Sequence, residues 1–222
     1  MGSIFEQAMG ADFERLHPML QRRFGVGLDR GEACVGHGTM TQIRRGPWWT
    51  VPFLQIGRLR NILVPDTGTD IPFVVENYPY RDPFGRETVT FVREYTISQH
   101  RSRFDATMVL AQGRIVDYLG THQHLAVDLD LTVDETGALI LTSDAQRFYE
   151  GPIAFRFPML FSGRARLRES FDEQTDAFQV DLEVHNRRFG FLFGYKGSFT
   201  CGWIPATDAP DRLKPKRHEH RT

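Results

Sequence analysis

The side chains best suited to chemistry gather in the stretch Gly113–Val133, which contains Asp117, Tyr118, His122 and His124. The histidines form an H-x-H pair. On a β-strand such a pair places both imidazoles on one face, with Cβ atoms roughly 6–7 Å apart. An imidazole titrates near neutral pH, so His122 is a candidate general acid or base.

A metal site at the histidine pair would need ligands from elsewhere in the chain. Zinc sites use three or four protein ligands, and the third would have to be His37, Asp128 or Glu150. Nothing in the spacing of these residues requires this arrangement. The sequence also lacks the glycine-rich phosphate motifs, the serine nucleophile elbow and the H-E-x-x-H zinc motif. We therefore predict no metal and no cofactor.

Three charged residues lie on the strand faces that are otherwise apolar and are predicted to be buried. Arg93 lies between Phe91 and Tyr95, Asp117 lies between Ile115 and Leu119, and Glu169 follows Leu167 and precedes Phe171. A buried charge is costly unless it has a partner, so a pair between Arg93 and either Glu169 or Asp117 is expected if these faces line one interior. One interpretation is a structural ion pair or a charge that reaches solvent at a strand end. The other is a polar anchor in an apolar pocket.

Further candidates lie in the aromatic stretch 147–163, which contains Pro152 and Pro158 and is predicted to be a loop over the barrel mouth or a broken edge strand. Its polar residues would act as a hook on a lid, or are simply solvated. His122 and Glu169 are the candidate catalytic residues. The residues predicted to contact a ligand are Arg93, Tyr95, Asp117, Tyr118, His122, His124, Arg147, Tyr149, Glu169 and Tyr195.

Alternating apolar and polar residues predict the strands that must position these side chains. From Leu119 to Val133 the odd positions are mostly apolar, which is typical of a strand with one buried face. Gly120 is predicted to kink this stretch between two strands. The stretch Phe189–Trp203 alternates most regularly, with aromatic residues on one face and glycine, serine and threonine on the other.

Helices are predicted only near the N-terminus, over Ser3–Phe24. Ser3 and Glu6 fit a capping box, Pro18 can begin a second helix, and Gly25 can end it. The segment is short and apolar on one side, so we expect it to cover a sheet.

The composition favours a strongly curved antiparallel sheet or β-barrel. The chain has 222 residues, with 18 Phe and 20 Gly; aromatic residues fill a concave face and glycines relieve crowding at bends. We predict an all-β fold with an interior cavity. One domain spans residues 1–205 with helices at 3–24, and residues 206–222 form a disordered tail rich in Pro, Lys, Arg and His.

Charge and cysteine content exclude several classes of protein. The net charge of -1 gives no basic excess for nucleic-acid binding, and no apolar run is long enough to span a membrane. The two cysteines, Cys34 and Cys201, lie far apart in strand-like runs and are interpreted as small buried thiols. With no signal sequence at the N-terminus, a cytoplasmic location is expected.

Several segments together resemble the bacterial domain-of-unknown-function family 4166, over nearly the whole chain apart from the tail. They are FEQAMGADFERLHPMLQRRFG, NYPYRDPFGRETVTFVREY, RFDATMV, GRIVDYLGTHQHLAVDL, QRFYEGPIAFRFPMLFSG and FGYKGSF. Members of that family occur alone or fused to saccharopine-dehydrogenase-like reductases. The resemblance implies no catalytic residues; it implies a module that holds a small apolar molecule or serves a reductase-type partner protein.

Three functions follow from these observations. The first is a small-molecule-binding module for an apolar or amphipathic ligand, whose polar end Arg93, Glu169 and His122 would orient. The second is a cofactor-free cyclase, isomerase or hydrolase in which His122 or Glu169 transfers a proton and Arg93 stabilises negative charge. The third is a protein-interaction domain with Tyr149–Phe161 as its contact patch. Whether the protein is an enzyme is left open.

Overall fold

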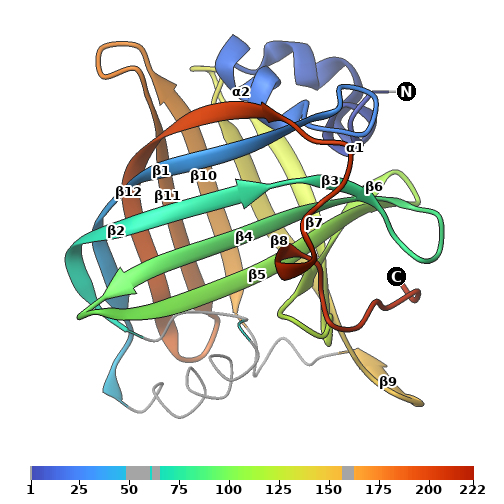
Figure 1. The fold of residues 1–222 in the computed structure, drawn as a ribbon. Coiled ribbons are helices and arrows are strands. Elements are labelled where there is room, and N and C mark those ends of the chain that lie inside the picture. The colour runs from blue at the N-terminus through green and yellow to red at the C-terminus, as the bar shows by residue number, and fades with distance from the viewer. Residues whose placement is uncertain (1, 49–60, 62–65, 157–162) are drawn as a thin grey trace.

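The protein folds as a closed antiparallel β-barrel, seen in the computed structural model in Figure 1. The structure describes residues 2–48, 61, 66–156 and 163–222. Its strands are β1 (Glu32–Arg45), β2 (Gly68–Asn77), β3 (Pro79–Arg81), β4 (Glu87–Ile97), β5 (His100–Ala111), β6 (Arg114–Leu119), β7 (Leu125–Val133), β8 (Leu139–Glu150), β9 (Ile153–Arg156), β10 (Arg164–Asp172), β11 (Ala177–Asn186) and β12 (Gly190–Pro205).

Ten of the described strands form the barrel wall in the order β10-β11-β12-β1-β2-β4-β5-β6-β7-β8. The wall closes because β8 pairs with β10, from Leu139 opposite Glu169 to Thr142 opposite Arg166. The strands β3 and β9 extend this sheet by pairing with β4 and β8. The predicted all-β barrel fold is therefore confirmed.

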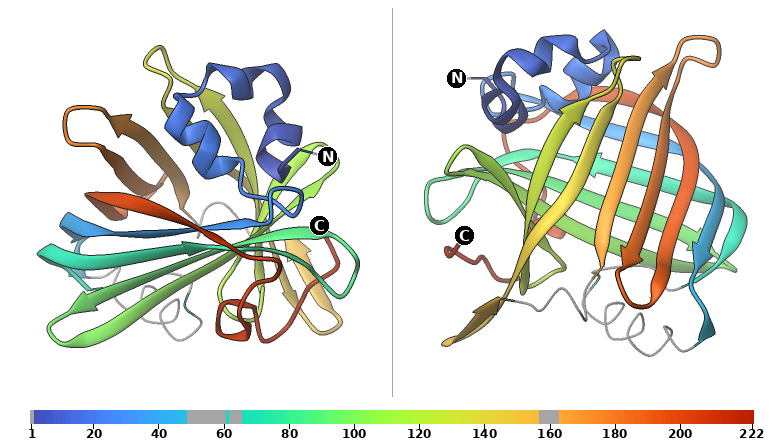
Figure 2. Two further views of the ribbon diagram at one scale, coloured as in Figure 1. Left: turned by 45° about the horizontal axis from the view of Figure 1, so that its top comes forward. Right: turned by 180° about the vertical axis from the view of Figure 1, so that it is seen from behind.

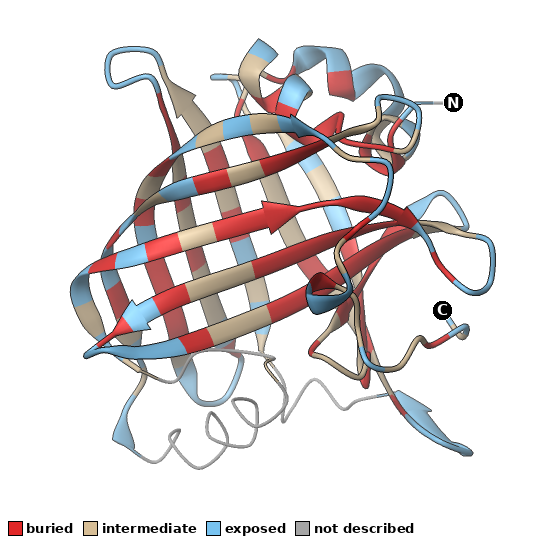
Figure 3. Cartoon of the chain, in the orientation of Figure 1, coloured by how far each residue is buried: buried red, intermediate tan, exposed pale blue. Residues whose placement is uncertain are grey.

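Successive side chains of each strand point alternately into and out of the barrel. Figure 3 shows this as buried residues alternating with more exposed ones along the strands. On β7, Val127 and Leu129 are buried in the interior cluster, whereas Asp130 is exposed. On β12, Tyr195 and Phe199 join the same cluster. A one-residue slip would turn every such side chain outward, so the pattern fixes the register.

A hairpin replaces the predicted kink at Gly120. The strand β6 ends at Leu119, the chain turns through residues 120–123, and β7 returns antiparallel beside β6. Gly120 (φ 81°) and Gln123 (φ 53°) adopt positive φ, which a reversal of this kind requires. His122 consequently lies in a turn, and the predicted placement of both histidines on one strand face is wrong.

Two short helices, α1 (Ile4–Met9) and α2 (Pro18–Phe24), cover one end of the barrel, with the 3-10 helix η1 (Gly10–Arg15) between them (Figure 2). The predicted start at Pro18 and end at Gly25 are confirmed. The rings of Phe5 and Phe24 reach the interior, with centroids 5.9 and 6.4 Å from that of Phe91. The helices therefore act as a plug whose apolar side continues the barrel core.

In the described chain, no helix is long and apolar enough to cross a membrane.

The C-terminal segment 206–222 differs from the expectation of a disordered tail. It follows the outside of the barrel (Figure 1) and contains the short helix η3 (Asp211–Leu213). Leu213 is 1% exposed and packs in a cluster with Tyr80 and Val92. Arg212 donates two hydrogen bonds of 2.6 Å to Glu76. Charges that look solvated in the sequence are thus paired with the barrel wall, and Leu213 supplies an apolar anchor.

Candidate functional site

The three charged residues on apolar strand phases all face the barrel interior. Arg93 alternates with the buried Phe91 and Tyr95 on β4, Asp117 follows Ile115 on β6, and Glu169 lies on β10. Asp117 is 8% exposed and Glu169 is 4% exposed, while Arg93 is only partly buried. The strand alternation therefore brings charges into an otherwise apolar interior.

Glu169 is paired with Arg23 from the plug, and not with Arg93 as the sequence led us to expect. The Arg23 Nε donates to the Glu169 carboxylate, and its Nη1 donates to the Asn77 side chain at 2.6 Å. Burial disfavours the charge of Arg23, but Glu169, Cys34 and Cys201 together outweigh it and raise the pKa of Arg23. The prediction missed this partner because Arg23 lies on a separate helical segment, which folds back over the barrel end.

Cys34 and Cys201 complete the surroundings of Arg23. The Arg23 Nη1 lies 3.2 Å from the Cys34 sulfur and 3.9 Å from the Cys201 sulfur. The guanidinium also lies over the ring of Phe199, 4.9 Å from its centroid. We call Arg23, Cys34, Asn77, Glu169 and Cys201 the Arg23 cluster. It holds the helical plug to four strands of the barrel wall, β1, β2, β10 and β12.

A second group of inward-facing polar residues consists of Arg93, Tyr95, Asp117 and Tyr195, which we call the inner polar cluster. The charge of Arg93 acts on the other three side chains, so they share one electrostatic environment. The hydroxyls of Tyr95 and Tyr195 lie near each other without reaching hydrogen-bond geometry. Burial raises the pKa of both tyrosines, which keeps them neutral.

Asp117 is the carboxyl group of the inner polar cluster. Its Oδ1 is buried and accepts no hydrogen bond from the described residues. Burial raises the pKa of Asp117 to about 7, although the positive charge of Arg93 acts in the opposite direction. A carboxyl group with such a pKa is close to half protonated at neutral pH and can either donate or accept a hydrogen bond.

Solvent reaches the inner wall near this cluster. Arg93 pairs across the sheet with Phe104, whose ring lies 4.9 Å from the guanidinium carbon. Phe104, Leu119 and Leu125 all belong to the interior apolar cluster, yet they are only partly buried. An apolar wall with accessible surface thus borders a cation, as a site for an amphipathic molecule requires.

Two predicted ligand contacts, Tyr118 and Tyr149, lie on the outer face of the wall. They pack with Val109, Val116 and Ala126 in a cluster separate from the interior. The Tyr118 hydroxyl donates to the Arg221 carbonyl at 2.6 Å, and the Arg221 guanidinium lies 4.6 Å from the ring centroid of Tyr149. The C-terminal segment therefore covers these two tyrosines, and they do not meet the inner polar cluster.

The histidine pair lies beside the same outer region. The rings of His122 and His124 stack with centroids 5.4 Å apart. The Nδ1 of His124 is 2.9 Å from the Glu150 carboxylate and 3.1 Å from the Tyr149 carbonyl oxygen. Within the described residues, no group of three histidine, cysteine or carboxylate side chains could hold a metal ion. Through these contacts, His124 connects the β6–β7 turn to the end of β8.

Arg147, the remaining candidate, lies on β8 and not in a loop. It forms a two-pronged ion pair with Asp128 of β7, one of whose contacts is 2.9 Å. Strand β8 extends to Glu150 and pairs with β9, so the edge-strand alternative describes this region better than a loop. Of the proposed contact patch Tyr149–Phe161, residues 157–162 lie outside the described part of the chain.

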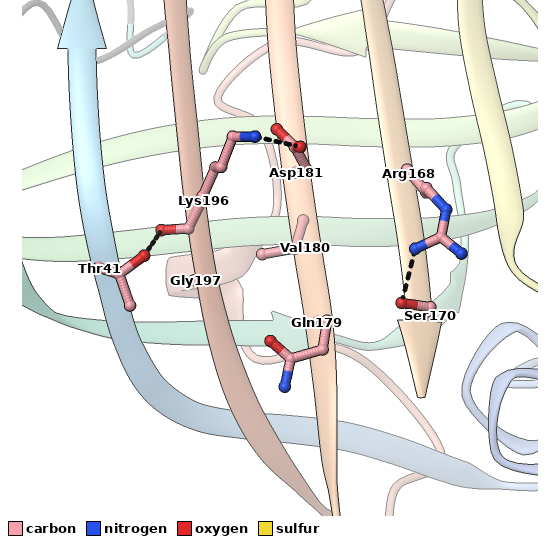
Figure 4. Close-up of a pocket in the computed structure, with 8 residues that line it drawn as sticks. All are labelled: Thr41, Arg168, Ser170, Gln179, Val180, Asp181, Lys196 and Gly197. Carbon is pink, nitrogen blue, oxygen red and sulfur yellow. Dashed lines mark hydrogen bonds and ion pairs between the residues drawn. The ribbon is translucent and has the colours of Figure 1, made fainter. Parts of the chain in front are cut away.

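A shallow pocket on the outer face, shown in Figure 4, involves none of the predicted site residues. Its volume is about 200 Å³. Lys196 pairs with Asp181 at 2.8 Å, and the Arg168 Nη1 donates to the Ser170 hydroxyl at 3.0 Å. These side chains are exposed or half-buried and pair with one another, although the Oδ1 of Asp181 accepts no hydrogen bond from the described residues. The lining residues are Thr41, Arg168, Ser170, Gln179, Val180, Asp181, Lys196 and Gly197.

Two features of the Arg23 cluster could have been recognised in the sequence. Leu16, Leu20 and Arg23 follow helical spacing, so the arginine occupies a position on the apolar stripe of its helix. Cys34 and Cys201 both fall on the apolar phase of a strand. Their proximity could not be predicted, because it depends on the pairing of the first strand with the last, between Glu32 and Arg45 of β1.

Comparison with known proteins agrees with the predicted resemblance. The family model described as "Domain of unknown function (DUF4166)" matches residues 16–199. The uncharacterized protein YndH of Bacillus subtilis is 29% identical over 201 residues, which cover 90% of this chain and 97% of YndH. The crystal structure of Rv2717c from M. tuberculosis has 10% identity and a TM-score of 0.40, covering 84% of this chain and 99% of that one. Since the family model spans most of the sequence, the protein belongs to the DUF4166 family.

Proposed function

We propose that the barrel binds a small amphipathic molecule whose polar end contacts the inner polar cluster. The observation that carries this proposal is the buried Oδ1 of Asp117, which accepts no hydrogen bond from the described residues. A buried polar atom of this kind costs about 1–3 kcal/mol. A ligand with a hydrogen-bond donor at this point would recover that energy.

The charged groups of the site determine which functional groups a ligand needs. Arg93 is joined to Asp117 by no ion pair within the described residues, so its guanidinium N–H groups are available to an acceptor such as a carboxylate or a carbonyl oxygen. Asp117 would contact a hydroxyl or amide of the same molecule. Phe104, Leu119 and Leu125 offer an apolar surface for the rest of the ligand.

A binding titration with a fluorescent long-chain carboxylic acid tests the proposal. We expect saturable binding by the unmodified protein and a decrease in affinity of about tenfold or more for Arg93→Gln, because a charge-assisted hydrogen bond contributes about 1.5–3 kcal/mol. The matched control is Arg101→Gln, an outward-facing arginine whose side chain is 83% exposed. Absence of saturable binding, or equal losses in both variants, would contradict the proposal.

Acid–base catalysis is a second candidate, and Asp117 favours it more than the residues first considered. Glu169 is engaged by Arg23, and His122 lies in a turn outside the inner polar cluster. A buried carboxyl with a pKa of about 7 is suited to proton transfer at neutral pH. A ligand recovered unchanged after incubation with the protein would support binding alone, whereas conversion that disappears in Asp117→Asn would support catalysis. The reductase-type partner stays a prediction drawn from the family resemblance.

A further inference from the structure

The two cysteines of the chain lie side by side inside the barrel, beneath the helical plug. Cys34 is on β1 and Cys201 is on β12, in diagonal positions of this strand pair, because Cys201 lies opposite Gly36 and Cys34 lies opposite Trp203. Both side chains face inward. Their sulfur atoms are 3.0 Å apart. Such close thiols can exchange a proton and, when oxidised, can form a bond.

The surroundings of the two sulfurs stabilise a thiolate. Arg23 places its Nη1 3.2 Å from the Cys34 sulfur and 3.9 Å from the Cys201 sulfur. The hydrogen bond with Cys201 lowers the pKa of Cys34 to about 7, and Arg23 adds to this effect against the opposing influence of burial and Glu169. After the first proton has left, the pKa of Cys201 is raised, because the remaining proton is shared with the neighbouring thiolate.

The two thiols differ in their access to solvent. Cys34 is 0% exposed, whereas Cys201 is partly exposed. The neighbouring Trp203 is also partly exposed, with the Arg22 guanidinium 4.0 Å from its ring centroid. A small reagent can therefore reach Cys201 before Cys34. This arrangement, with one accessible thiol and one protected thiol, is characteristic of a dithiol that reacts in two steps.

We propose that Cys34 and Cys201 form a redox-active dithiol that is converted to an internal disulfide by exchange with a small-molecule disulfide. Cys34 first loses its proton, and the Cys201 thiol then passes its own proton to the Cys34 thiolate across the 3.0 Å contact. The resulting Cys201 thiolate attacks one sulfur of the reagent and breaks its S–S bond. The Cys34 sulfur then loses its proton, attacks Cys201 and releases the second half of the reagent. Two protein thiols are oxidised, the reagent is reduced to two thiols, and the two protons pass to these products.

The backbone around the cysteines permits the small movement that the disulfide requires. A disulfide bond is about 2.05 Å long, so the sulfurs must approach each other by about 1 Å. Gly36 faces Cys201 across the strand pair, and Gly202 follows it in the chain. Glycines at both places leave the strands more freedom to adjust than bulkier residues would.

Incubation of the full chain with glutathione disulfide, followed by alkylation and intact-mass analysis, tests this proposal. We expect the protein to lose two hydrogens, to resist alkylation and to carry no glutathione, with digestion yielding Cys34 and Cys201 in one linked pair of peptides. Treatment with a dithiol reductant should reverse the change. A protein that stays reduced, or that accumulates a glutathione adduct without the linked peptides, would overturn the proposal.

Single-cysteine variants separate the two steps. Cys34→Ser should retain a stable glutathione adduct on Cys201, because the resolving thiol is missing. Cys201→Ser should stay unmodified in the folded state, because Cys34 is 0% exposed. Circular dichroism and thermal unfolding verify that both variants are folded. An adduct on Cys34 in the folded Cys201→Ser protein would contradict the proposed order in which the two thiols react. The linked peptides of the unmodified chain test the disulfide itself and depend on neither variant.

Discussion

Two groups of charged side chains lie inside one barrel and differ in how completely they are paired. In the Arg23 cluster, Arg23 bonds to Glu169 and Asn77 at the covered end. In the inner polar cluster, no ion pair joins Arg93 to Asp117 within the described residues, and the Asp117 Oδ1 accepts no hydrogen bond there. Both groups are enclosed by the same apolar wall, but they differ in their partners and in the exposure of the cation, since Arg23 is buried and Arg93 is half-buried.

The two clusters therefore differ in what they contribute: the paired one to the stability of the fold, and the unsatisfied one to the binding of a ligand. A buried ion pair with satisfied hydrogen bonds holds two elements in one geometry, and here it holds a helix to the barrel. A buried carboxyl that is left unsatisfied is retained at a cost in stability, which is typical of functional sites. We therefore expect changes in the Arg23–Glu169 pair to act mainly on folding, and changes in the inner polar cluster to act mainly on ligand affinity and on pH dependence.

The largest effect is expected from Glu169→Gln. This change keeps the shape of the side chain but leaves Arg23 as an uncompensated buried cation, which should lower the free energy of unfolding by about 3–5 kcal/mol. Urea denaturation measures the loss. Glu173→Gln is the control, because the Glu173 side chain is 81% exposed and contacts only His17 among the described ion pairs. A cost below about 1 kcal/mol for Glu169→Gln would remove the distinction between the two clusters.

Asp117→Asn should change the pH dependence of stability. Burial raises the pKa of Asp117 from 3.8 to about 7 in the folded state, so the unfolded chain binds fewer protons between these values. The stability contributed by the neutral carboxyl is fully present below pH 3.8 and is lost as the pH rises through about 7. The shift of roughly three units corresponds to at most about 4 kcal/mol. Urea titrations at several pH values should show this decrease for the unmodified protein and not for Asp117→Asn.

Glu219→Gln should release the C-terminal segment with a smaller effect. Glu219 accepts hydrogen bonds from Arg217 at 2.6 Å and from Arg221 at 2.7 Å. These bonds outweigh the opposing effect of burial and lower the pKa of Glu219 from 4.5 to about 2, so their stabilisation is lost as the pH falls through this range. We expect a loss of about 1–2 kcal/mol and faster tryptic cleavage at Lys216. Equal cleavage rates in Glu135→Gln, a change in an exposed turn, would contradict this expectation.

Lys196→Ala, in the outer pocket, should have the smallest effect. Its side chain is 48% exposed and that of its partner Asp181 is 42% exposed, so solvent screens the pair and its loss should change stability by less than about 1 kcal/mol. Affinity for the fluorescent acid should be unchanged. A marked loss of binding in Lys196→Ala would instead move the ligand site from the barrel interior to the outer face.

Alternation along single strands allowed much of the fold to be predicted. The strand Glu87–Ile97 was predicted with the bounds that β4 has, and the inward positions of Arg93, Asp117 and Glu169 followed from their phase. The prediction of a barrel followed from strand content and glycine spacing. These features are local, and each strand displays its buried face in its own sequence.

Contacts between distant segments could not be predicted in the same way. The sequence offers Glu169 or Asp117 as a partner of Arg93, because all three lie on strand faces that are otherwise apolar, yet the cation that pairs with Glu169 belongs to a helix. Tyr118 and Tyr149 were grouped with the interior residues, although they face a C-terminal segment that lacks an apolar pattern. In both cases the decisive partner is remote in the chain, and period-2 patterns carry no information about remote partners.

The pairing of the first strand with the last has a consequence for the kinetics of folding. Glu32 at the start of β1 pairs with Pro205 at the end of β12, and Arg23 reaches Glu169 across 146 positions of the chain. During synthesis, β1 can pair with β2 early, but its second edge and Arg23 find their partners only after strands β10 to β12 have left the ribosome. Such long-range closure slows folding and leaves the edge of β1 exposed in the meantime, so the early chain is the part most in need of chaperone protection.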